Sequence, residues 1–371
     1  MTFKSRETLP GTAFTLPARY YTDRALFERE LELFYRRMWV GVGRLEEIPE
    51  RGSYLTREIA GDSILVLRPT GDDDVRAFFN VCRHRGTRLC GDDAGRLAGA
   101  IQCPYHAWTY DYEGRLIGAP HMDGSPGFVR DDFPLGRVRA GVWDGFVFVS
   151  LAADGLPLGE HLAALPVKFA PWRLGDLVRA HRIVYDVRAN WKLIVQNYNE
   201  CLHCPTLHPG LNKLSHYLSG ENEPLQPTYM GGRMDLNDGV QTMTGDGTCA
   251  RDPLPGLSAA DRRRVYYYSV FPNFLIAPHP DYVLTHTLWP IAPDRTRIVC
   301  EWLVHPRERA KADFDLTDAT AFWDMTNRQD WQVCELAQAG ISSPAYRPGP
   351  YSNREDLLFA FDQFVRRTLG D

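Results

Sequence analysis

The first periodic segment of the chain has apolar residues at helical spacing, namely Phe27, Leu31, Phe34 and Met38. Thr22 precedes this segment and belongs to the residue types that cap the N-termini of helices. The pattern therefore predicts an amphipathic helix that runs from Thr22 to about Arg37 and serves packing.

After Trp39 the pattern changes to short segments in which apolar and polar residues alternate, as they do in half-buried strands. Turn-forming pairs such as Gly61-Asp62 and Glu113-Gly114 separate these segments. The predicted strands are residues 53–58, 63–68, 75–81 and 141–150. Together they predict a small all-β domain over residues 38–150.

The second half of the chain mixes both periodicities. A predicted strand at residues 180–187 precedes a helix that begins near Asn190 and ends at Pro205, because proline breaks a helix interior. Residues 210–257 are rich in Gly, Asp, Asn and Thr, and they predict a long loop that could admit a substrate.

Three further segments alternate in polarity and are joined by short turns. Residues 264–276, 282–291 and 295–304 predict an antiparallel meander. A last helix is predicted from Thr317 to Ala339, with Gly340 as the residue that follows its end. We therefore expect an α+β protein in which residues 1–37 and 151–371 form the second domain.

The composition is that of a globular protein with room for two domains: 371 residues, 44% hydrophobic and 24% charged. The net charge of −5 gives no sign of a nucleic-acid surface. Residues 1–19 lack the apolar segment of a signal peptide, and no run approaches the roughly 18 apolar residues of a membrane span. We therefore expect no membrane contact and a cytoplasmic location. Eight cysteines are too few for a disulfide scaffold, and we expect Cys201 and Cys204 to be ordinary buried thiols.

Two short segments each combine one cysteine with one histidine: Cys82 with His84, and Cys103 with His106. Both lie at strand ends of the predicted β domain, where loops can wrap a cofactor. In a Rieske [2Fe–2S] cluster, two cysteines bind one iron and two histidines bind the other. A structural zinc site uses the same residue types, but zinc fingers usually pair like ligands on each segment. The spacing therefore favours the cluster over zinc.

Glu200, His203 and His208 form a second group of metal-binding residue types. Glu200 and His203 are three residues apart and would share a face of the predicted helix. The helix end at Pro205 would let His208 fold back beside His203. Two histidines and one carboxylate that leave open positions form the facial triad of non-haem Fe(II) oxygenases.

The last predicted helix offers two candidates for a carboxylate ligand, Asp324 and Asp330. Because they are six residues apart, they lie about 240° apart around the helix and cannot both face one metal ion. Residues at helical spacing from Asp330 are mostly apolar, and a carboxylate on a packed face is costly unless a cation compensates it. We therefore predict Asp330 as the ligand.

These motifs resemble the α subunits of Rieske non-haem iron oxygenases. The residues that carry the resemblance are Asn80-Val-Cys-Arg-His-Arg-Gly86, Cys103-Pro-Tyr-His-Ala-Trp108, the series Asn197, Glu200, His203 and His208, and Asp330-Trp-Gln-Val-Cys-Glu335. The resemblance implies an N-terminal all-β Rieske domain and a helix-grip catalytic domain, whose antiparallel sheet curves around a long C-terminal helix. It also implies a [2Fe–2S] cluster, a mononuclear Fe(II) and electrons from NAD(P)H. A separate flavoprotein reductase would deliver these electrons, since the chain has no flavin or nicotinamide fingerprint.

The resemblance further implies a head-to-tail homotrimer, in which His106 of one subunit lies near Glu200 of the next. We expect Glu200 to bridge that histidine to His203 in electron transfer, as a carboxylate that accepts a hydrogen bond from each ring. Many family members have an aspartate here, and a glutamate resembles the subgroup that oxidises carnitine, choline and glycine betaine. The implied function is hydroxylation of a quaternary ammonium compound that leads to N-demethylation or C–N cleavage.

Two other functions remain as alternatives. One is an aromatic ring-hydroxylating dioxygenase that forms cis-dihydrodiols. The other is a Rieske electron carrier without catalysis, which would leave Glu200, His203, His208 and Asp330 without a role.

Aromatic residues alternate along residues 264–274, so roughly every second ring should face the inside of the sheet. Tyr266, Tyr268 and Phe271, with Trp289 on the next strand, could form an aromatic box that binds a trimethylammonium group by cation–π contact. Rings in a sheet are more often plain hydrophobic core, and this alternative stays open.

Overall fold

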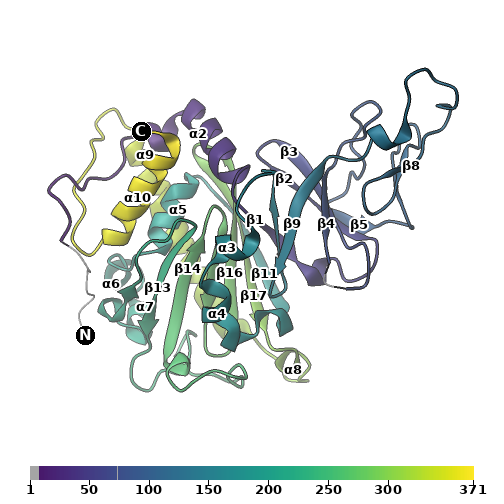
Figure 1. The fold of residues 1–371 in the computed structure, drawn as a ribbon. Coiled ribbons are helices and arrows are strands. Elements are labelled where there is room, and N and C mark those ends of the chain that lie inside the picture. The colour runs from purple at the N-terminus through teal and green to yellow at the C-terminus, as the bar shows by residue number, and fades with distance from the viewer. Residues whose placement is uncertain (1–7, 73) are drawn as a thin grey trace. The chain divides into compact units, whose positions relative to one another are not determined.

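The computed structural model describes residues 8–72 and 74–371, which form two compact units (Figure 1). One unit, Leu31–His161, consists mainly of strands. The other joins the described residues up to Glu30 with Leu162–Asp371 and combines one large sheet with helices. Within the described ranges, no helix has both the length and the hydropathy that a membrane crossing requires. The predicted α+β class is confirmed.

The smaller unit is built on an antiparallel sheet in the order β1-β10-β9-β4-β3-β2-β5, beside a small sheet β6-β7-β8. Its strands are β1 (Val40–Arg44), β2 (Ser53–Ile59), β3 (Asp62–Leu67), β4 (Arg76–Phe79), β5 (Ala94–Arg96), β6 (Ile101–Gln102), β7 (Thr109–Tyr110), β8 (Leu116–Gly118), β9 (Arg137–Trp143) and β10 (Phe146–Ser150). The segment 141–150, predicted as one strand, is split between β9 and β10. The chain reverses there because Asp144 and Gly145 both have positive φ.

The larger unit contains one antiparallel sheet in the order β11-β17-β16-β15-β14-β13-β12. Its strands are β11 (Val178–Val187), β12 (Glu221–Asn222), β13 (Tyr229–Asp235), β14 (Arg264–Val270), β15 (Phe274–Pro278), β16 (Val283–Ala292) and β17 (Arg295–Val304). The predicted meander is confirmed. Its first segment is two strands, because the chain turns at residues 271–273 between β14 and β15.

Strand β13 lies inside the segment that was predicted as a long loop. It contains Gly231 and Gly232, and glycine has a low strand propensity that conceals the strand in the sequence pattern. The structure requires glycine at position 231, since a Cβ atom there would collide with the backbone carbonyl of Tyr267 on β14. The two strands therefore approach each other with no side chain between them at this point.

The long helix of the larger unit is α9 (Thr317–Ile341), which packs against α5 (Trp191–Tyr198) and β11. Asn190 caps α5, as expected, by accepting a hydrogen bond from the backbone N–H of Lys192. Helix α9 ends at Ile341, one residue past Gly340. A further amphipathic helix, α10 (Asp356–Leu369), follows, and it was not predicted from the sequence. The remaining α-helices are short: α1 (Arg19–Thr22), α2 (Arg24–Glu30), α3 (Leu158–Leu162), α4 (Leu165–Phe169), α6 (Cys204–Leu207), α7 (Pro209–Leu214) and α8 (Pro306–Arg309).

The predicted N-terminal helix is interrupted. Helix α1 ends at Thr22, and α2 is followed by a π-helical turn, Leu31–Tyr35. The prediction that Thr22 caps the helix was wrong: Asp23 does so, because its Oδ1 accepts a hydrogen bond from the N–H of Leu26. The hydroxyl of Thr22 donates instead to the carbonyl of Ala18, within α1.

Candidate active site

The two Cys/His segments of the smaller unit fold into loops of the same backbone design. In the first, the N–H of Cys82 donates to the carbonyl of Thr87, five residues later, at 2.8 Å. The carbonyl of Cys82 accepts a hydrogen bond from the N–H of Gly86 at 3.0 Å. In the second, Cys103 makes the same two bonds, with Trp108 and Ala107, at 2.8 and 3.1 Å. Gly86 and Ala107 occupy equivalent positions, and both have positive φ. Each loop thus wraps its cysteine in the same way.

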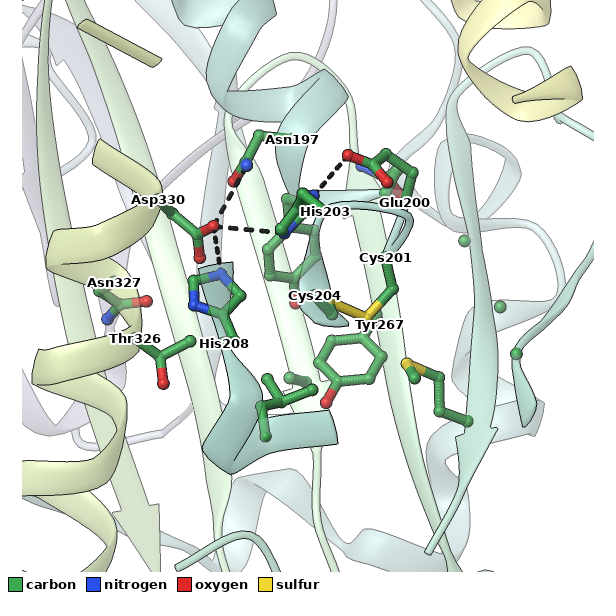
Figure 2. A pocket seen from close by; sticks show the side chains of 18 of the residues that line it. Asn197, Glu200, Cys201, His203, Cys204, His208, Tyr267, Thr326, Asn327 and Asp330 are labelled. Carbon is green, nitrogen blue, oxygen red and sulfur yellow. Dashed lines mark hydrogen bonds and ion pairs between the residues drawn. A yellow bond between two sulfur atoms is a disulfide. The ribbon is translucent and has the colours of Figure 1, made fainter. Parts of the chain in front are cut away.

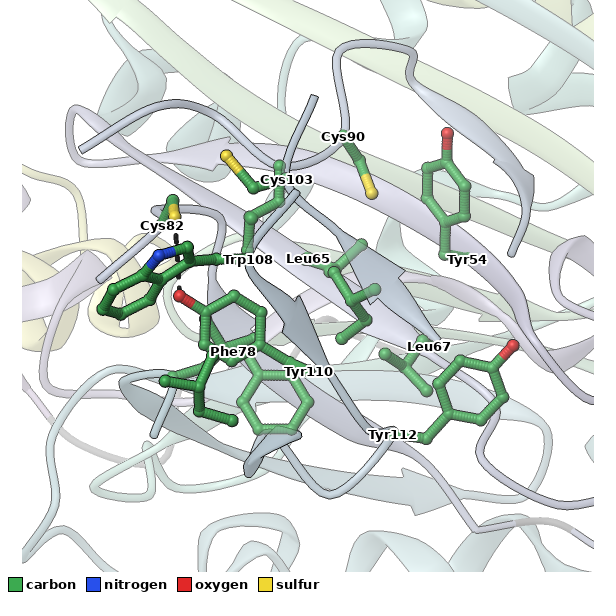
Figure 3. Close-up of a cluster of buried hydrophobic side chains, with 14 residues drawn as sticks. Tyr54, Leu65, Leu67, Phe78, Cys82, Cys90, Cys103, Trp108, Tyr110 and Tyr112 are labelled. Carbon is green, nitrogen blue, oxygen red and sulfur yellow. Dashed lines mark hydrogen bonds between the residues drawn. The ribbon is translucent and has the colours of Figure 1, made fainter. Parts of the chain in front are cut away.

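The loops place their thiols inside and their imidazoles outside. Cys82 and Cys103 are free and only 2% and 3% exposed, at one edge of a buried hydrophobic cluster that includes Tyr110 (Figure 3). His84 is exposed and His106 partly so, and their ring centroids lie 4.8 Å apart. All four residues that the sequence singled out are therefore brought to one end of this unit.

The spread of these four residues fits a two-iron cluster better than a single zinc ion. One zinc ion holds its ligand atoms about 2.0–2.3 Å from itself, so three ligands of one zinc would lie within 4.8 Å of one another. Across the described chain, the only group of three metal-binding side chains this compact lies elsewhere, in the larger unit. Buried thiols on one iron and outer imidazoles on the other are the ligand arrangement of a Rieske cluster.

The compact group is His203, His208 and Asp330, whose ligand atoms all lie within 4.8 Å of one another (Figure 2). The short helix α6 separates the two histidines, because His203 precedes it and His208 follows it. Asp330 comes from the middle of α9, and its Oδ1 lies 2.7 Å from Nε2 of His208 and 3.4 Å from Nε2 of His203. Two imidazoles and one carboxylate converge, which is the donor set of a facial-triad iron site.

The helix expected to carry Glu200 and His203 does not reach them. Helix α5 ends at Tyr198, so the two residues lie in the following turn and share no helix face. Pro205 opens α6 rather than ending α5, which agrees with the preference of proline for the first helical turn. Glu200 and His203 nevertheless meet, since Oε1 of Glu200 lies 2.5 Å from Nδ1 of His203.

Each ring of the group is held from outside by a second side chain. Glu200 binds Nδ1 of His203, and Oε1 of Gln329 lies 2.7 Å from Nδ1 of His208. Both rings therefore turn Nε2 towards Asp330, ready to bind a metal ion. Gln329 was not predicted as a site residue, although it directly precedes Asp330 in the chain.

Charge at this site favours a bound cation. Burial lowers the pKa of His203, but hydrogen bonds with Asp330 and Glu200 raise it more strongly, to about 10. Burial raises the pKa of Asp330, and its bonds to His203 and His208 outweigh this effect, so that the pKa falls below its ordinary value. Two carboxylates thus hold positive charge here, and the donor set fits a divalent iron ion.

The other helix candidate, Asp324, lies away from this group. It accepts hydrogen bonds from the hydroxyl of Tyr185 at 2.8 Å and from Nε of Arg328 at 2.9 Å. Its carboxylate is therefore already bonded to two other side chains.

Cys201 and Cys204 form a disulfide, so the prediction of ordinary thiols was wrong. A tight turn, closed by a hydrogen bond from Cys204 N–H to the carbonyl of Cys201, brings the two Cα atoms to 5.0 Å. The disulfide closes a short loop that contains Leu202 and His203, beside the metal-binding group (Figure 2).

A cavity of the larger unit adjoins the group. Besides the metal-binding residues, its lining includes the aromatic residues Tyr198, Tyr267, Trp323 and Trp331, together with His286 and Arg233. None of these six was predicted to line a substrate cavity, although Tyr198, Tyr267 and Trp331 lie next to residues that were predicted to have a role.

The four rings of the predicted aromatic box line no part of this cavity. Tyr266 and Tyr268 point to the opposite side of β14, where both pack against Phe169. Phe271 stacks on Phe364 of α10, and Trp289 is half-buried on β16. The alternation along β14 was predicted correctly but with the wrong phase, because Tyr267 is the ring that faces the cavity.

Comparison with known proteins places the chain in a family. Residues 174–371 match the ring-hydroxylating α subunit catalytic domain, and residues 38–131 match the Rieske [2Fe–2S] domain. The glycine betaine monooxygenase oxygenase subunit of Pseudomonas aeruginosa is 32% identical over 396 residues, which cover 97% of this chain and 90% of that protein. The carnitine monooxygenase oxygenase subunit of Escherichia coli is 39% identical over 206 residues, 55% of this chain and 54% of that protein.

A solved structure shows the same fold. It is that of a quaternary ammonium Rieske monooxygenase, described for carnitine oxidation and inter-subunit electron transfer. It matches with a TM-score of 0.80 at 23% identity and covers 98% of this chain and 100% of its own.

The chain is therefore a Rieske-type oxygenase subunit. It belongs to the ring-hydroxylating oxygenase α-subunit family, whose cofactors are a Rieske [2Fe–2S] cluster and a mononuclear iron. The predicted family, enzyme class and cofactors are confirmed.

Proposed function

We propose that this chain is the oxygenase component that hydroxylates a small quaternary ammonium compound and thereby cleaves a C–N bond. The observation that carries the proposal is the cavity beside the three metal-binding residues, which has an aromatic wall. This wall consists of Tyr198, Tyr267, Trp323 and Trp331. Aromatic faces attract a cation by roughly 0.5–2 kcal/mol each, which a neutral aromatic substrate would not exploit. The names of the full-length relatives support the same substrate class.

We assign the cofactors to the two predicted domains. Residues 38–150 would form the Rieske domain, with Cys82, His84, Cys103 and His106 as cluster ligands. Residues 1–37 and 151–371 would form the catalytic domain, with His203, His208 and Asp330 as iron ligands. The family matches at residues 38–131 and 174–371 support this division. The smaller compact unit, Leu31–His161, contains the proposed Rieske domain and extends beyond it at both ends.

The side chains of the chain itself position the reaction. When bound, the [2Fe–2S] cluster would supply one-electron transfer and the mononuclear iron would supply the activation of O2. Glu200 and Gln329 keep the Nε2 atoms of the two histidines directed to the centre, and Asn197 donates a hydrogen bond of 3.2 Å to Oδ1 of Asp330. The aromatic wall would hold the ammonium group with one of its carbon substituents near that centre.

The chemistry balances with O2, two electrons and two protons. One oxygen atom is inserted into a C–H bond next to nitrogen, and the other leaves as water. The resulting hydroxymethyl ammonium breaks its C–N bond: the nitrogen keeps the electron pair, the hydroxyl proton passes to solvent, and formaldehyde and a tertiary amine are released.

The electrons must reach the cluster from a donor protein and then pass from the cluster to the iron, and this path indicates the partners. We propose a homotrimer in which His106 of one subunit approaches Glu200 of the next, with an NAD(P)H-dependent flavoprotein reductase as electron donor. His106 is partly exposed and the Glu200 side chain is 15% exposed, and this exposure supports the proposed contact with a neighbouring chain. A carboxylate can accept a hydrogen bond from each imidazole and so link the two rings.

A product screen tests the function. Purified protein is supplied with a surrogate reductase, NADH, and a panel of glycine betaine, carnitine, choline, naphthalene and benzoate. We expect formaldehyde or another C–N cleavage product from a quaternary amine only. Formation of a cis-dihydrodiol from an aromatic substrate, with no turnover of the amines, would establish the dioxygenase alternative instead.

A further inference from the structure

The disulfide between Cys201 and Cys204 contributes little to the stability of the fold. A disulfide stabilises a protein mainly by closing a long loop of the unfolded chain, and these two cysteines are only three positions apart. The other six cysteines are free. Within the described structure, Cys201 and Cys204 are the only cysteines that line the cavity beside the metal-binding group. The position of the pair therefore indicates a chemical role.

The two sulfur atoms are accessible to small molecules that enter the cavity. The exposed fractions of Cys201 and Cys204 are 7% and 3%, so the active site of a protein disulfide reductase is too large to approach them. The cavity is also the place where O2 would be reduced, because it adjoins the proposed iron ligands. When a bound substrate is not oxidised, two electrons and two protons convert O2 into H2O2. This H2O2 would form in the same cavity as the cysteine pair.

We propose that Cys201 and Cys204 form a peroxide-reactive dithiol site, and that oxidation of this site to the disulfide slows electron transfer through Glu200. One thiol attacks H2O2, the O–O bond breaks, water leaves, and the sulfur becomes a sulfenic acid. The second thiol attacks this sulfur, the S–O bond breaks, and another water leaves as the disulfide forms. The dithiol thus loses two electrons and two protons, and H2O2 is reduced to water. A small thiol in excess reverses the reaction by thiol–disulfide exchange.

The disulfide form holds the carboxylate of Glu200 against its own loop (Figure 2). Oε1 of Glu200 lies 2.5 Å from Nδ1 of His203, and Oε2 accepts a hydrogen bond from the N–H of Leu202, inside the loop that the disulfide closes. The Glu200 side chain is only 15% exposed in this position. Reduction removes the covalent closure and leaves the hydrogen bond from the N–H of Cys204 to the carbonyl of Cys201. The N–H of Leu202 can then move away, and Oε2 becomes available to a neighbouring subunit.

The test treats the iron-loaded holoenzyme with H2O2. The enzyme is first reduced with dithiothreitol, freed of it, and then mixed with an equimolar amount of H2O2. Alkylation followed by mass spectrometry identifies the remaining thiols, and we expect Cys201 and Cys204 to be lost together as a disulfide. The rate of transfer from cluster to iron, measured by stopped-flow absorbance, should fall at least about tenfold, as is typical when the outer partner of a metal-binding histidine is impaired. Dithiothreitol should restore both the thiols and the rate.

Two variants distinguish this site from general oxidation. Cys249 is more exposed than the pair but does not line the cavity, so Cys249→Ser is the matched control. H2O2 should slow transfer in Cys249→Ser as much as in the unaltered enzyme. In the double variant Cys201→Ser/Cys204→Ser, the rate should be the same before and after H2O2.

The effect on transfer rests on the proposed function, because it requires Glu200 to be the bridge, whereas disulfide formation does not. Thiols that stay intact after H2O2 would overturn the peroxide site. Equal transfer rates in the dithiol and disulfide forms of the unaltered enzyme would overturn the control of electron transfer, and so would an equal loss of rate in the double variant. Normal transfer in Glu200→Ala would instead refute the bridge, and with it the electron path of the proposed function.

Discussion

Oε1 of Glu200 lies 2.5 Å from Nδ1 of His203, on the side of the ring away from Asp330. The imidazole is thus held between two carboxylates, one that would bind the iron with it and one that reaches outward. This arrangement leaves the second oxygen of Glu200 near the backbone N–H of Leu202, and a small movement would free it for a neighbouring subunit.

We expect Glu200→Ala to retain iron and a reducible cluster while product formation falls by orders of magnitude. The carboxylate is the link between two imidazoles in the proposed trimer, so its loss should slow transfer from cluster to iron. Stopped-flow absorbance under single-turnover conditions locates the defect, with Asp324→Ala as the control, since this carboxylate is bonded to Tyr185 and Arg328. Near-normal turnover at full metal content would exclude the bridge.

Asp330→Ala should remove the mononuclear iron and all activity but leave the cluster absorbance intact, because one of three protein ligands is lost. Asp324→Ala should keep its iron, since this carboxylate is bonded to Tyr185 and Arg328. Metal analysis of both variants checks the expectation. Loss of iron in Asp324→Ala with retention in Asp330→Ala would show that Asp324, not Asp330, is the iron ligand.

Gln329→Leu should weaken iron retention by about 10–100-fold, as is typical when the outer partner of a metal-binding histidine is lost. The change leaves Nδ1 of His208 without its hydrogen bond and lets the ring rotate. Competition with a chelator measures retention independently of turnover. Gln332→Leu, an exposed position on the same helix, is the control and should behave like the unaltered enzyme.

Glycine betaine should bind far more tightly than 3,3-dimethylbutanoate, in which carbon replaces the nitrogen. The zwitterion and the anion share a carboxylate, shape and apolar area, so the difference isolates the attraction between the ammonium group and the aromatic wall. Isothermal titration of the holoenzyme with both compounds measures it. Similar affinities would favour a neutral substrate and the aromatic dioxygenase alternative.

The stability of the larger unit should depend on the protonation of Asp362. This residue is fully buried and accepts hydrogen bonds from Gln196 at 2.6 Å and Tyr351 at 2.8 Å. Burial raises its pKa to about 7, although these bonds and the charge of Lys192 oppose the shift. The folded pKa lies above the unfolded value of about 4. The protonated carboxyl therefore stabilises the fold fully below about pH 4, and this contribution is lost as the pH rises through 7.

We therefore expect the unaltered protein to lose stability relative to Asp362→Asn as the pH rises from about 4 to about 7. The full difference across the titration is up to roughly 4 kcal/mol in unfolding free energy. Thermal unfolding followed by circular dichroism at several pH values measures it. Parallel curves for the two proteins would show that Asp362 titrates normally.

The parts of the fold that depend on local pattern could be predicted from the sequence. Strand alternation identified β2, β3, β16 and β17, and the spacing of ligand types selected residues that the structure brings together at two centres. These inferences succeed because a short loop or a strand repeats a local geometry.

The remaining features depend on tertiary contacts. Which ring of β14 faces the cavity is decided by what packs on each side of the sheet, and Phe169, far away in sequence, covers Tyr266 and Tyr268. The partner of His208 is Gln329, on a helix 121 residues away. No local pattern encodes such a pairing, and the disulfide likewise depends on a turn that the assumed helix had concealed.

The glycines of β13 set a limit on how this cavity can change during evolution. Gly231 and Gly232 line it with bare backbone, and a Cβ atom at either position would collide with main-chain atoms of a neighbouring strand. No single substitution at Gly231 or Gly232 can therefore change the shape of this side of the cavity. A descendant of this enzyme that accepts a longer or bulkier substrate would have to gain space elsewhere in the lining, for example at Leu284 or Leu211.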